Sequence, residues 1–265
     1  LVTVAVPGII HGIVASQLPE ATYIILPSDM GVISDSGVPI LRQALENVDS
    51  LLLGPGWGTE RPTADFIHGI FSSVKDDVTA GIGFAVESKG NTNAEFDTQR
   101  LPPTVVDADG LRLLAQLPEW YLRLPARSVL TPHPGEMAFL TGLSIDEIQS
   151  DRINVASRFA VEWGHIVVLK GAFTVVCTPE GNVTVNPFAN SALACAGTGD
   201  VLAGLIAGLL AQGMQPHQAA VAGTFLHGLA GEIALSEVGT AASVIASDVL
   251  DVTPKAISSV MSQFA

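Results

Sequence analysis

The residues best suited to chemistry lie in one turn, Gly197-Thr-Gly-Asp200, which leads directly into a long run of small apolar residues. The first amides of a helix have no intrahelical partner, and the helix dipole adds about half a positive charge there. Gly197 and Gly199 let the backbone approach an anion closely, so the turn can hold a phosphate with amides alone. Asp200 beside that phosphate suits a base that takes the proton of an attacking hydroxyl. The alternative is a tight turn in which Asp200 only caps the helix.

Four further segments place unusual residues directly after runs that predict strands. They are Gly54-Pro-Gly-Trp-Gly58, Asp107-Ala-Asp109, Thr131-Pro-His-Pro-Gly-Glu136 and Lys170-Gly-Ala-Phe-Thr174. The glycine-rich segment suits close approach of a ligand, although a plain strand-to-helix turn has the same composition. The two acids of the second segment could bind substrate hydroxyls or hydrated Mg²⁺, or one of them could cap the next helix.

The third and fourth segments carry more specific signals. Two prolines fix the 131–136 loop, so His133 and Glu136 have defined positions. An isolated histidine is more often structural, and His227, on an apolar helical face, belongs to that class. Lys170 ends an apolar strand beside a glycine, which suits contact with a nucleotide phosphate. The sequence contains no Walker A motif, no GxGxxG after the first strand, no HExxH and no GxSxG.

The elements that must position these residues alternate between strands and helices. Short apolar runs, several of them ending in Gly, Pro or Asp, predict strands at 2–6, 23–26, 50–53, 104–107, 129–131 and 166–170. Helical spacing predicts helices at 40–48, 63–74, 144–163, 216–237 and 246–261. This order indicates an α/β fold with a mostly parallel sheet, right-handed crossovers and a ligand crevice at the carboxyl ends of the strands.

Two segments interrupt the alternation. Residues 173–178 and 183–186, joined by a Pro-Glu-Gly-Asn turn, predict an antiparallel hairpin. Residues 81–103 predict a mobile surface excursion without catalytic residues.

Composition excludes several classes of protein. The 265-residue chain is 48% hydrophobic with a net charge of −14, which argues against a nucleic-acid surface. Its two cysteines lie in apolar runs, so we expect neither a disulfide framework nor a Cys-rich metal site. The longest apolar run, 201–211, is too short to cross a bilayer and no signal sequence opens the chain. We therefore expect a cytoplasmic protein without membrane partners.

Four motifs in sequence order give a more specific indication. They are TPHPGE at 131–136, LKGAFT at 169–174, ALACAGTGDVLAGLIAGLLAQG at 192–213 and FLHGLAGEIA at 225–234. Together they resemble the ADP- or ATP-dependent NAD(P)H-hydrate dehydratases of the ribokinase-like superfamily. The resemblance implies one ribokinase-like domain over residues 1–265, with helices flanking the central sheet. It also implies a metabolite-repair lyase that phosphorylates the C6 hydroxyl of hydrated NADH or NADPH (NADHX or NADPHX) and then eliminates phosphate.

The resemblance assigns roles to individual residues. It assigns catalysis to Asp200, with Gly197, Thr198 and Gly199 supporting the moving phosphoryl group. It assigns the nucleotide, ADP or ATP, to Lys170, Gly171, Ala172, Phe173, Thr174, Asn190, Ser191, Gly197, Thr198 and Gly199. It assigns binding of the hydrated dinucleotide to Gly56, Gly58 and His133. We also place Asp107, Asp109, Glu136 and Asp200 near this substrate. Mg²⁺ is expected to accompany the nucleotide, without a dedicated protein metal site.

The chain also departs from the family pattern. Members place a strand, a glycine-rich loop and a helix ahead of the segment that opens here at Leu1, so we expect the 2–6 strand to have one unpaired flank. A second departure is Phe188-Ala-Asn-Ser, which stands where a glycine is expected and leaves the shape of the nucleotide loop open.

The resemblance extends to partners, and it leaves rival functions open. It implies a homo-oligomer, a tetramer, and either fusion to or partnership with an epimerase for the same damaged cofactor. One rival is a kinase of the same superfamily that acts on a vitamin-precursor alcohol. The other is a non-catalytic nucleotide-binding protein.

Overall fold

The computed structural model describes residues 1–71 and 101–262, and the statements below concern these residues. The predicted excursion at 81–103 lies, up to residue 100, outside the described residues. The main sheet has six strands in the order β10-β9-β8-β7-β6-β5. The strands are β5 (Leu51–Leu53), β6 (Thr104–Val106), β7 (Val129–Leu130), β8 (Ile166–Leu169), β9 (Val175–Cys177) and β10 (Val183–Val185).

The pairing of these strands confirms the predicted sheet. β5, β6, β7 and β8 are mutually parallel, with Leu51 opposite Thr104 and Val129 opposite Ile166. β9 and β10 form the predicted antiparallel hairpin, and β9 pairs antiparallel with β8. The side chains of β6 to β9 are buried throughout, as expected for strands covered on both faces.

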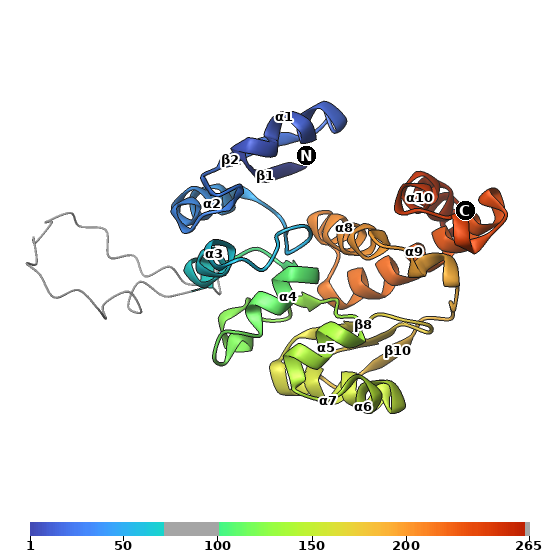
Figure 1. The fold of residues 1–265 in the computed structure, drawn as a ribbon. Coiled ribbons are helices and arrows are strands. Elements are labelled where there is room, and N and C mark those ends of the chain that lie inside the picture. Colours follow the sequence, from blue (N-terminus) through green and yellow to red (C-terminus); the bar gives the residue numbers. More distant parts are fainter. Residues whose placement is uncertain (72–100, 263–265) are drawn as a thin grey trace, which may run out of the picture.

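Helices cover both faces of this sheet (Figure 1). One face packs against α3 (Arg61–Phe71), α4 (Ala108–Leu114), α5 (Pro134–Thr141), α6 (Ile145–Ser150) and α7 (Arg152–Trp163). The other face packs against α8 (Thr198–Ala211) and α9 (Pro216–Val238), and α10 (Ala246–Met261) packs on α9.

The single helix predicted over 144–163 is wrong, because α6 ends at Ser150 and α7 begins at Arg152. Asp151 between them has φ −147° and ψ 58°, outside the helical region, and its carboxylate accepts a hydrogen bond from Asn154 Nδ2 at 2.9 Å. Short polar side chains that bond locally in this way compete with the helix.

The N-terminal residues form a separate layer. β1 (Thr3–Pro7) and β2 (Thr22–Leu26) are parallel strands joined by α1 (Gly8–Gln17), and they make a two-stranded sheet of their own. Short strands β3 (Ser28–Asp29) and β4 (Val32–Ile33) and the helix α2 (Val38–Ala44) then lead to β5.

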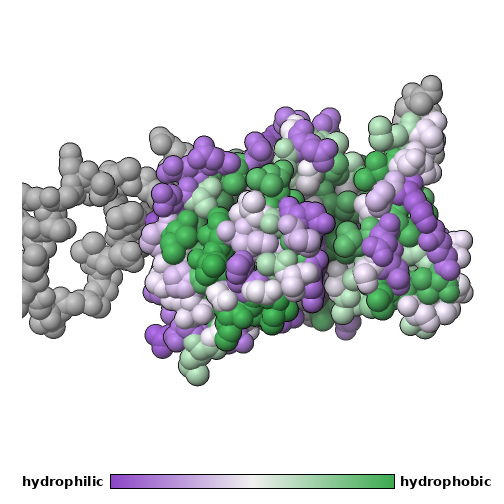
Figure 2. Space-filling model, turned by 90° about the horizontal axis from the view of Figure 1, so that it is seen from above, coloured by the Kyte–Doolittle hydropathy of each residue, from purple (hydrophilic) through white to green (hydrophobic). Residues whose placement is uncertain are grey.

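Within the described residues, β1 pairs only with β2 and β5 pairs only with β6. The expected unpaired flank on the 2–6 strand is present within these residues, where β5 likewise has a partner on one side only. α1 buries none of its residues, and Ile9, Ile13 and Ile25 are exposed in this layer. Figure 2 views the molecule from this side and shows apolar surface among polar residues.

Among the described helices, α9 alone is long and apolar enough to cross a membrane by length and composition. Half of its most apolar window is buried against the rest of the fold. Ala219, Ala220, Ala230 and Ala234 are fully buried, so α9 serves here as a core helix.

Candidate active site

The carboxyl ends of the parallel strands bring the predicted residues to one edge of the sheet. Asp107 N donates to Leu53 O at 3.1 Å, and Lys170 N donates to Pro132 O at 2.8 Å. These bonds continue the strand ladder past β5, β6, β7 and β8, so the side chains that follow the strands lie close together.

Lys170 is the cation at the centre of this edge. Its Nζ lies 2.5 Å from Asp107 Oδ1 and 3.7 Å from Glu136 Oε2. The side chains of Asp107 and Glu136 are only 1% and 5% exposed, and that of Lys170 is 16% exposed. Asp107 Oδ2 has no hydrogen-bond partner among the described residues. The sequence analysis placed Lys170 with the nucleotide and Asp107 with the substrate, and the structure joins the two in one largely desolvated ion pair.

The Gly197–Asp200 turn faces this ion pair. Gly197, with φ +87°, is the N-cap of α8, and no side chain caps the helix. Asp200 is the third helical residue, so the reading of Asp200 as a mere N-cap is wrong. A Cβ added to Gly199 would lie 3.3 Å from Lys170 Nζ and 3.8 Å from Asp107 Oδ2. The uncapped helix start, the cation and the carboxylate therefore share one small region.

Asp200 has the electrostatic setting of a base. Its pKa is raised above the ordinary value, first because neighbouring groups desolvate it and then because of the Asp107 carboxylate. Asp109 adds a smaller effect in the same direction, whereas Lys170 opposes the rise. The side chain itself remains exposed, so a bound hydroxyl can reach a carboxylate that accepts protons more readily than a free aspartate.

The glycine-rich loop after β5 packs against the two acids. Gly58 N donates to Asp109 Oδ2 at 2.9 Å. A Cβ on Gly54, which has φ +116°, would lie 1.9 Å from Asp107 O, so only glycine permits this approach. Gly56 also has a positive φ, and nothing lies within 4 Å of its added Cβ. The structure thus brings together the 54–58 loop and the acids, as the proposed substrate site requires.

His133 and Glu136 hold each other at the start of α5. His133 Nδ1 accepts hydrogen bonds from Gly135 N at 2.9 Å and Glu136 N at 3.2 Å, and Glu136 Oε2 accepts one from His133 N at 2.8 Å. This capping box fixes both side chains. His133 stays about half exposed, with Nε2 3.3 Å from Glu136 Oε1. Its contact with a substrate remains a prediction.

The two segments assigned to the nucleotide are also neighbours. Phe173 N donates to Phe188 O and Asn186 N donates to Thr174 O, both at 2.8 Å, so the 170–174 loop is bonded to the chain that leads into the 190–199 segment. Asn190 Oδ1 accepts from Ala192 N at 2.9 Å, which shapes the second loop. Gly171, Ala172 and Ser191 are exposed and available to a ligand.

One cation beside the 170–174 loop is not signalled by any motif. Arg152, at the start of α7, donates from Nη2 to Leu169 O at 2.9 Å, and its Nη1 would lie 2.9 Å from a Cβ on Gly171. It therefore packs directly beneath the 170–174 loop. No motif signals this contact, because Arg152 lies on a helix well upstream of the loop.

The sequence reasoning left His227 of α9 in the structural class, and the structure buries it to 8% exposure. Its pKa also responds to the backbone of Thr198, in the first turn of α8, so the two groups lie near each other, and Nε2 has no hydrogen-bond partner among the described residues. Burial lowers the pKa of His227 to about 4, so the ring is neutral near neutral pH. Sequence spacing alone gives no sign of this link between α9 and the Gly197–Asp200 turn.

Comparison with known proteins is decisive at this point. A sequence model of the NAD(P)H-hydrate dehydratase family matches residues 1–255. The chain belongs to the NAD(P)H-hydrate dehydratase family. It is 38% identical over 255 residues to the bifunctional NAD(P)H-hydrate repair enzyme of Moorella thermoacetica, covering 96% of this chain and 43% of that protein. It is also 38% identical over 176 residues to the ADP-dependent (S)-NAD(P)H-hydrate dehydratase of Neisseria meningitidis, covering 65% of this chain and 59% of that protein.

Solved structures confirm the ribokinase-like fold of this dehydratase-family chain. The ADP/ATP-dependent NAD(P)H-hydrate dehydratase from Bacillus subtilis, co-crystallized with ATP and Mg²⁺, matches with a TM-score of 0.72 and 26% identity. The match covers 97% of this chain and 78% of that one. A hydroxyethylthiazole kinase from Pyrococcus horikoshii, at 15% identity, 96% coverage of this chain, 85% coverage of its own and a TM-score of 0.60, shares the fold alone.

Proposed function

We propose that this chain dehydrates the hydrated nicotinamide ring of NADH or NADPH at the expense of ADP or ATP. Family membership gives the reaction class. The chain spans less than half of the Moorella relative, so the activity of the isolated chain is our proposal. The observation that carries it is the placement of Asp200 in the uncapped first turn of α8, against the Lys170–Asp107 pair.

The first step uses this geometry directly. Asp200 accepts the proton of the C6 hydroxyl while the hydroxyl oxygen bonds to the terminal phosphorus and the bond to the nucleotide leaving group breaks. The amides of Gly197, Thr198 and Gly199 support the charge on the phosphoryl oxygens, and Lys170 adds a positive charge beside them.

The second step needs little from the protein. The phosphate on C6 leaves as inorganic phosphate, pushed by the ring nitrogen lone pair, and the neighbouring carbon then loses a proton to restore the double bond. Without phosphorylation, the C6 hydroxyl would have to leave as hydroxide, which is a far poorer leaving group than phosphate. This difference is the reason for the phosphoryl transfer. The sum is hydrated cofactor plus ADP or ATP giving NAD(P)H, phosphate and AMP or ADP.

The hydrated dinucleotide is proposed to lie along the 54–58 loop and His133. The bond from Gly58 N to Asp109 and the contact of Gly54 with Asp107 place this loop beside the two acids. Gly56 leaves open space, and His133 presents its exposed edge at the same end of the sheet. The nucleotide is proposed to lie against residues 170–174 and 190–199, with Arg152 supporting the first of these loops.

Among the described residues, Asp107 and Glu136 lie where a Mg²⁺ ion accompanying the nucleotide would be expected, and both are already beside Lys170. No group of three or more His, Cys, Asp or Glu side chains among the described residues could hold a metal ion, and Lys170 already occupies Asp107 and Glu136. Mg²⁺ is therefore proposed to arrive with the nucleotide, held by phosphate oxygens and water.

The test is recovery of the near-ultraviolet absorbance of the reduced nicotinamide ring when hydrated NADH or NADPH is supplied with ADP or with ATP. Recovery that depends on the nucleotide supports the proposal, and the two donors reveal the preference. A kinase acting on an unrelated alcohol would consume ATP without restoring the absorbance. Binding of ADP without turnover would instead support a non-catalytic nucleotide-binding protein.

The open flanks of β1 and β5 support a proposal about the complete protein. We propose that a strand outside this chain pairs with both flanks and joins the two sheets, and that its loop completes the substrate pocket. Supplying that segment should improve binding of the hydrated dinucleotide but not of ADP. Full activity of a natural protein that begins at Leu1, shown by intact mass, would contradict this. We further propose a cytoplasmic tetramer that acts with an epimerase for the same damaged cofactor, in one chain or two, since its relatives are named bifunctional repair enzymes.

A further inference from the structure

Two glycines of α9 receive side chains from the segment that leads into the nucleotide loop. A Cβ on Gly228 would lie 2.2 Å from Phe188 Cδ2 and 2.6 Å from its Cγ, and a Cβ on Gly231 would lie 2.7 Å from Leu193 Cγ. Contacts this close mean that the Phe188 ring rests directly on the backbone of α9. The two glycines are one helical turn apart, so together they form a seat for residues 188–193.

Phe188 also reaches the other loop assigned to the nucleotide. Its carbonyl accepts the 2.8 Å hydrogen bond from Phe173 N, and Phe173 holds the left-handed conformation with φ +54°. The Phe188 ring packs edge-on against Phe225 of α9, with the two ring centroids 5.3 Å apart. A single residue thus ties the 170–174 loop to α9.

We propose that Phe188, seated on Gly228, is a positioning residue that sets the spacing between the two nucleotide loops and thereby the affinity for the nucleotide. The proposal rests on the nucleotide role assigned above to residues 170–174 and 190–199. Phe188 opens the segment that leads into Asn190 and Ser191, so an aromatic ring stands at the start of the second nucleotide loop.

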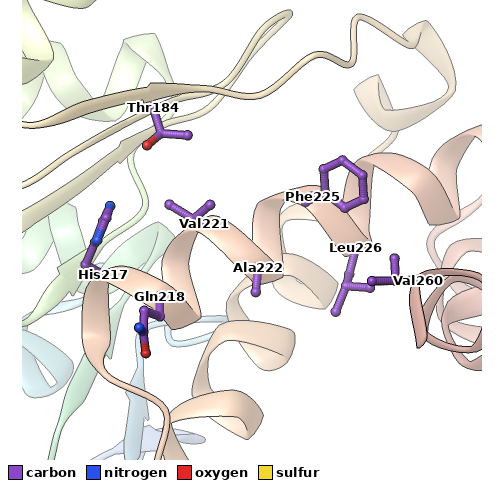
Figure 3. A pocket seen from close by; sticks show the side chains of 8 residues that line it. All are labelled: Thr184, His217, Gln218, Val221, Ala222, Phe225, Leu226 and Val260. Atoms are coloured by element: carbon purple, nitrogen blue, oxygen red, sulfur yellow. The ribbon is translucent and has the colours of Figure 1, made fainter. Parts of the chain in front are cut away.

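The surroundings of Phe225 allow this contact to change without unfolding the protein. Phe225 lines a pocket of about 440 Å³ between β10 and α9, opposite Thr184 and beside Val221 (Figure 3). One member of the Phe188–Phe225 pair, Phe225, therefore borders open space. A ring displaced from Gly228 can shift, and because Phe188 O bonds Phe173 N, the 170–174 loop should shift with it.

The test compares Gly228→Ala with Gly223→Ala on the same helix. A Cβ on Gly223 would lie 2.6 Å from Ile206 Cγ1, so this control also crowds α9 but touches neither loop. We expect Gly228→Ala to raise Kd and KM for ADP about tenfold, the loss expected for one displaced hydrogen bond, with little change in KM for the hydrated dinucleotide. Gly223→Ala should lower Tm and leave both KM values unchanged. Phe188→Leu, which replaces the ring with a smaller side chain and introduces no clash, should weaken ADP binding as well.

The double variant supplies the decisive measurement. If Gly228 acts through Phe188, adding Gly228→Ala to Phe188→Ala should produce no further loss of ADP affinity. Unchanged ADP affinity in folded Gly228→Ala and Phe188→Leu would overturn the proposal, as would equal rises in both KM values in Gly228→Ala and Gly223→Ala. Failure of the wild-type chain to bind ADP would overturn the proposed function itself, an outcome seen before any variant is made.

Discussion

Replacing Lys170 by Met should destabilise the fold far more than a surface lysine would. The Lys170–Asp107 pair is largely desolvated, with side-chain exposures of 16% and 1%, so the variant leaves the buried Asp107 carboxylate without its near cation, and Glu136 loses the same cation at 3.7 Å. Breaking a buried pair in this way costs about 3–5 kcal/mol, a large part of the roughly 5–15 kcal/mol that holds a typical domain together.

The chain offers a matched control in Lys255→Met. Lys255 Nζ lies 2.7 Å from Glu237 Oε1, a contact of similar length, but the two side chains are 60% and 48% exposed. Exposed pairs contribute about 0–1 kcal/mol, so this variant should unfold at nearly the wild-type urea concentration.

The measurement is the free energy of unfolding from urea titration, with the m value checked for constancy. Adding Asp107→Asn to Lys170→Met removes the orphaned charge, so it should recover most of the lost stability. Equal costs for the two lysine variants, or no recovery in the double variant, would refute the view that Lys170 compensates a buried carboxylate.

Further outcomes follow from the site. Asp200→Asn should lower kcat about 10²–10⁴-fold, while calorimetry should still detect ADP binding. A nearly full rate would show that Asp200 is not the base. His133→Ala should raise KM for the hydrated cofactor much more than KM for ADP, and equal effects would move His133 out of the substrate pocket. Because burial and Asp107 raise the pKa of Asp200, the acid limb of kcat/KM should lie above the ordinary aspartate range, and Asp109→Asn should move it to lower pH. The pKa of His227 is about 4 in the fold and 6.5 ordinarily, so the unfolded chain takes up a proton first as pH falls and stability is lost between these values. A pKa shift of this size corresponds to about 3 kcal/mol of stability. In urea titrations at several pH values, the free energy of unfolding of His227→Gln should therefore fall less steeply with decreasing pH between 6.5 and 4 than that of the wild type.

The strands that position the site were predictable because they are short apolar runs, most of them containing β-branched residues, and several are followed by Gly, Pro or Asp. The helix start at Thr198 was equally predictable, since the glycines and the apolar run that follows leave few other conformations. The antiparallel hairpin followed from its Pro-Glu-Gly-Asn turn. In each case the signal is local, and local signals survive in a sequence without an alignment.

Contacts across the sheet edge were not predictable. The pairing of Lys170 with Asp107 depends on the register of β6 against β7 and β7 against β8, which no periodicity encodes. His133 caps its own helix through Nδ1, so this nitrogen is not free for a ligand. The sequence does not show which of the two roles Nδ1 takes. The break at Asp151 was missed because helical spacing continues through it, although the Asp151 backbone leaves the helical region and its carboxylate bonds Asn154 in the first turn of α7.

The open flanks of β1 and β5 have a consequence for the behaviour of this chain in solution. Among the residues that the structure describes, each flank presents backbone amides and carbonyls that an extended segment of another molecule can pair with, and exposed isoleucines lie in the layer formed by α1, β1 and β2. Edges of this kind template aggregation, so the isolated chain should self-associate with rising concentration and on heating. Light scattering should therefore rise with protein concentration at temperatures well below those that unfold the core. Self-association, rather than unfolding, would then set the highest concentration and temperature at which this protein stays in solution.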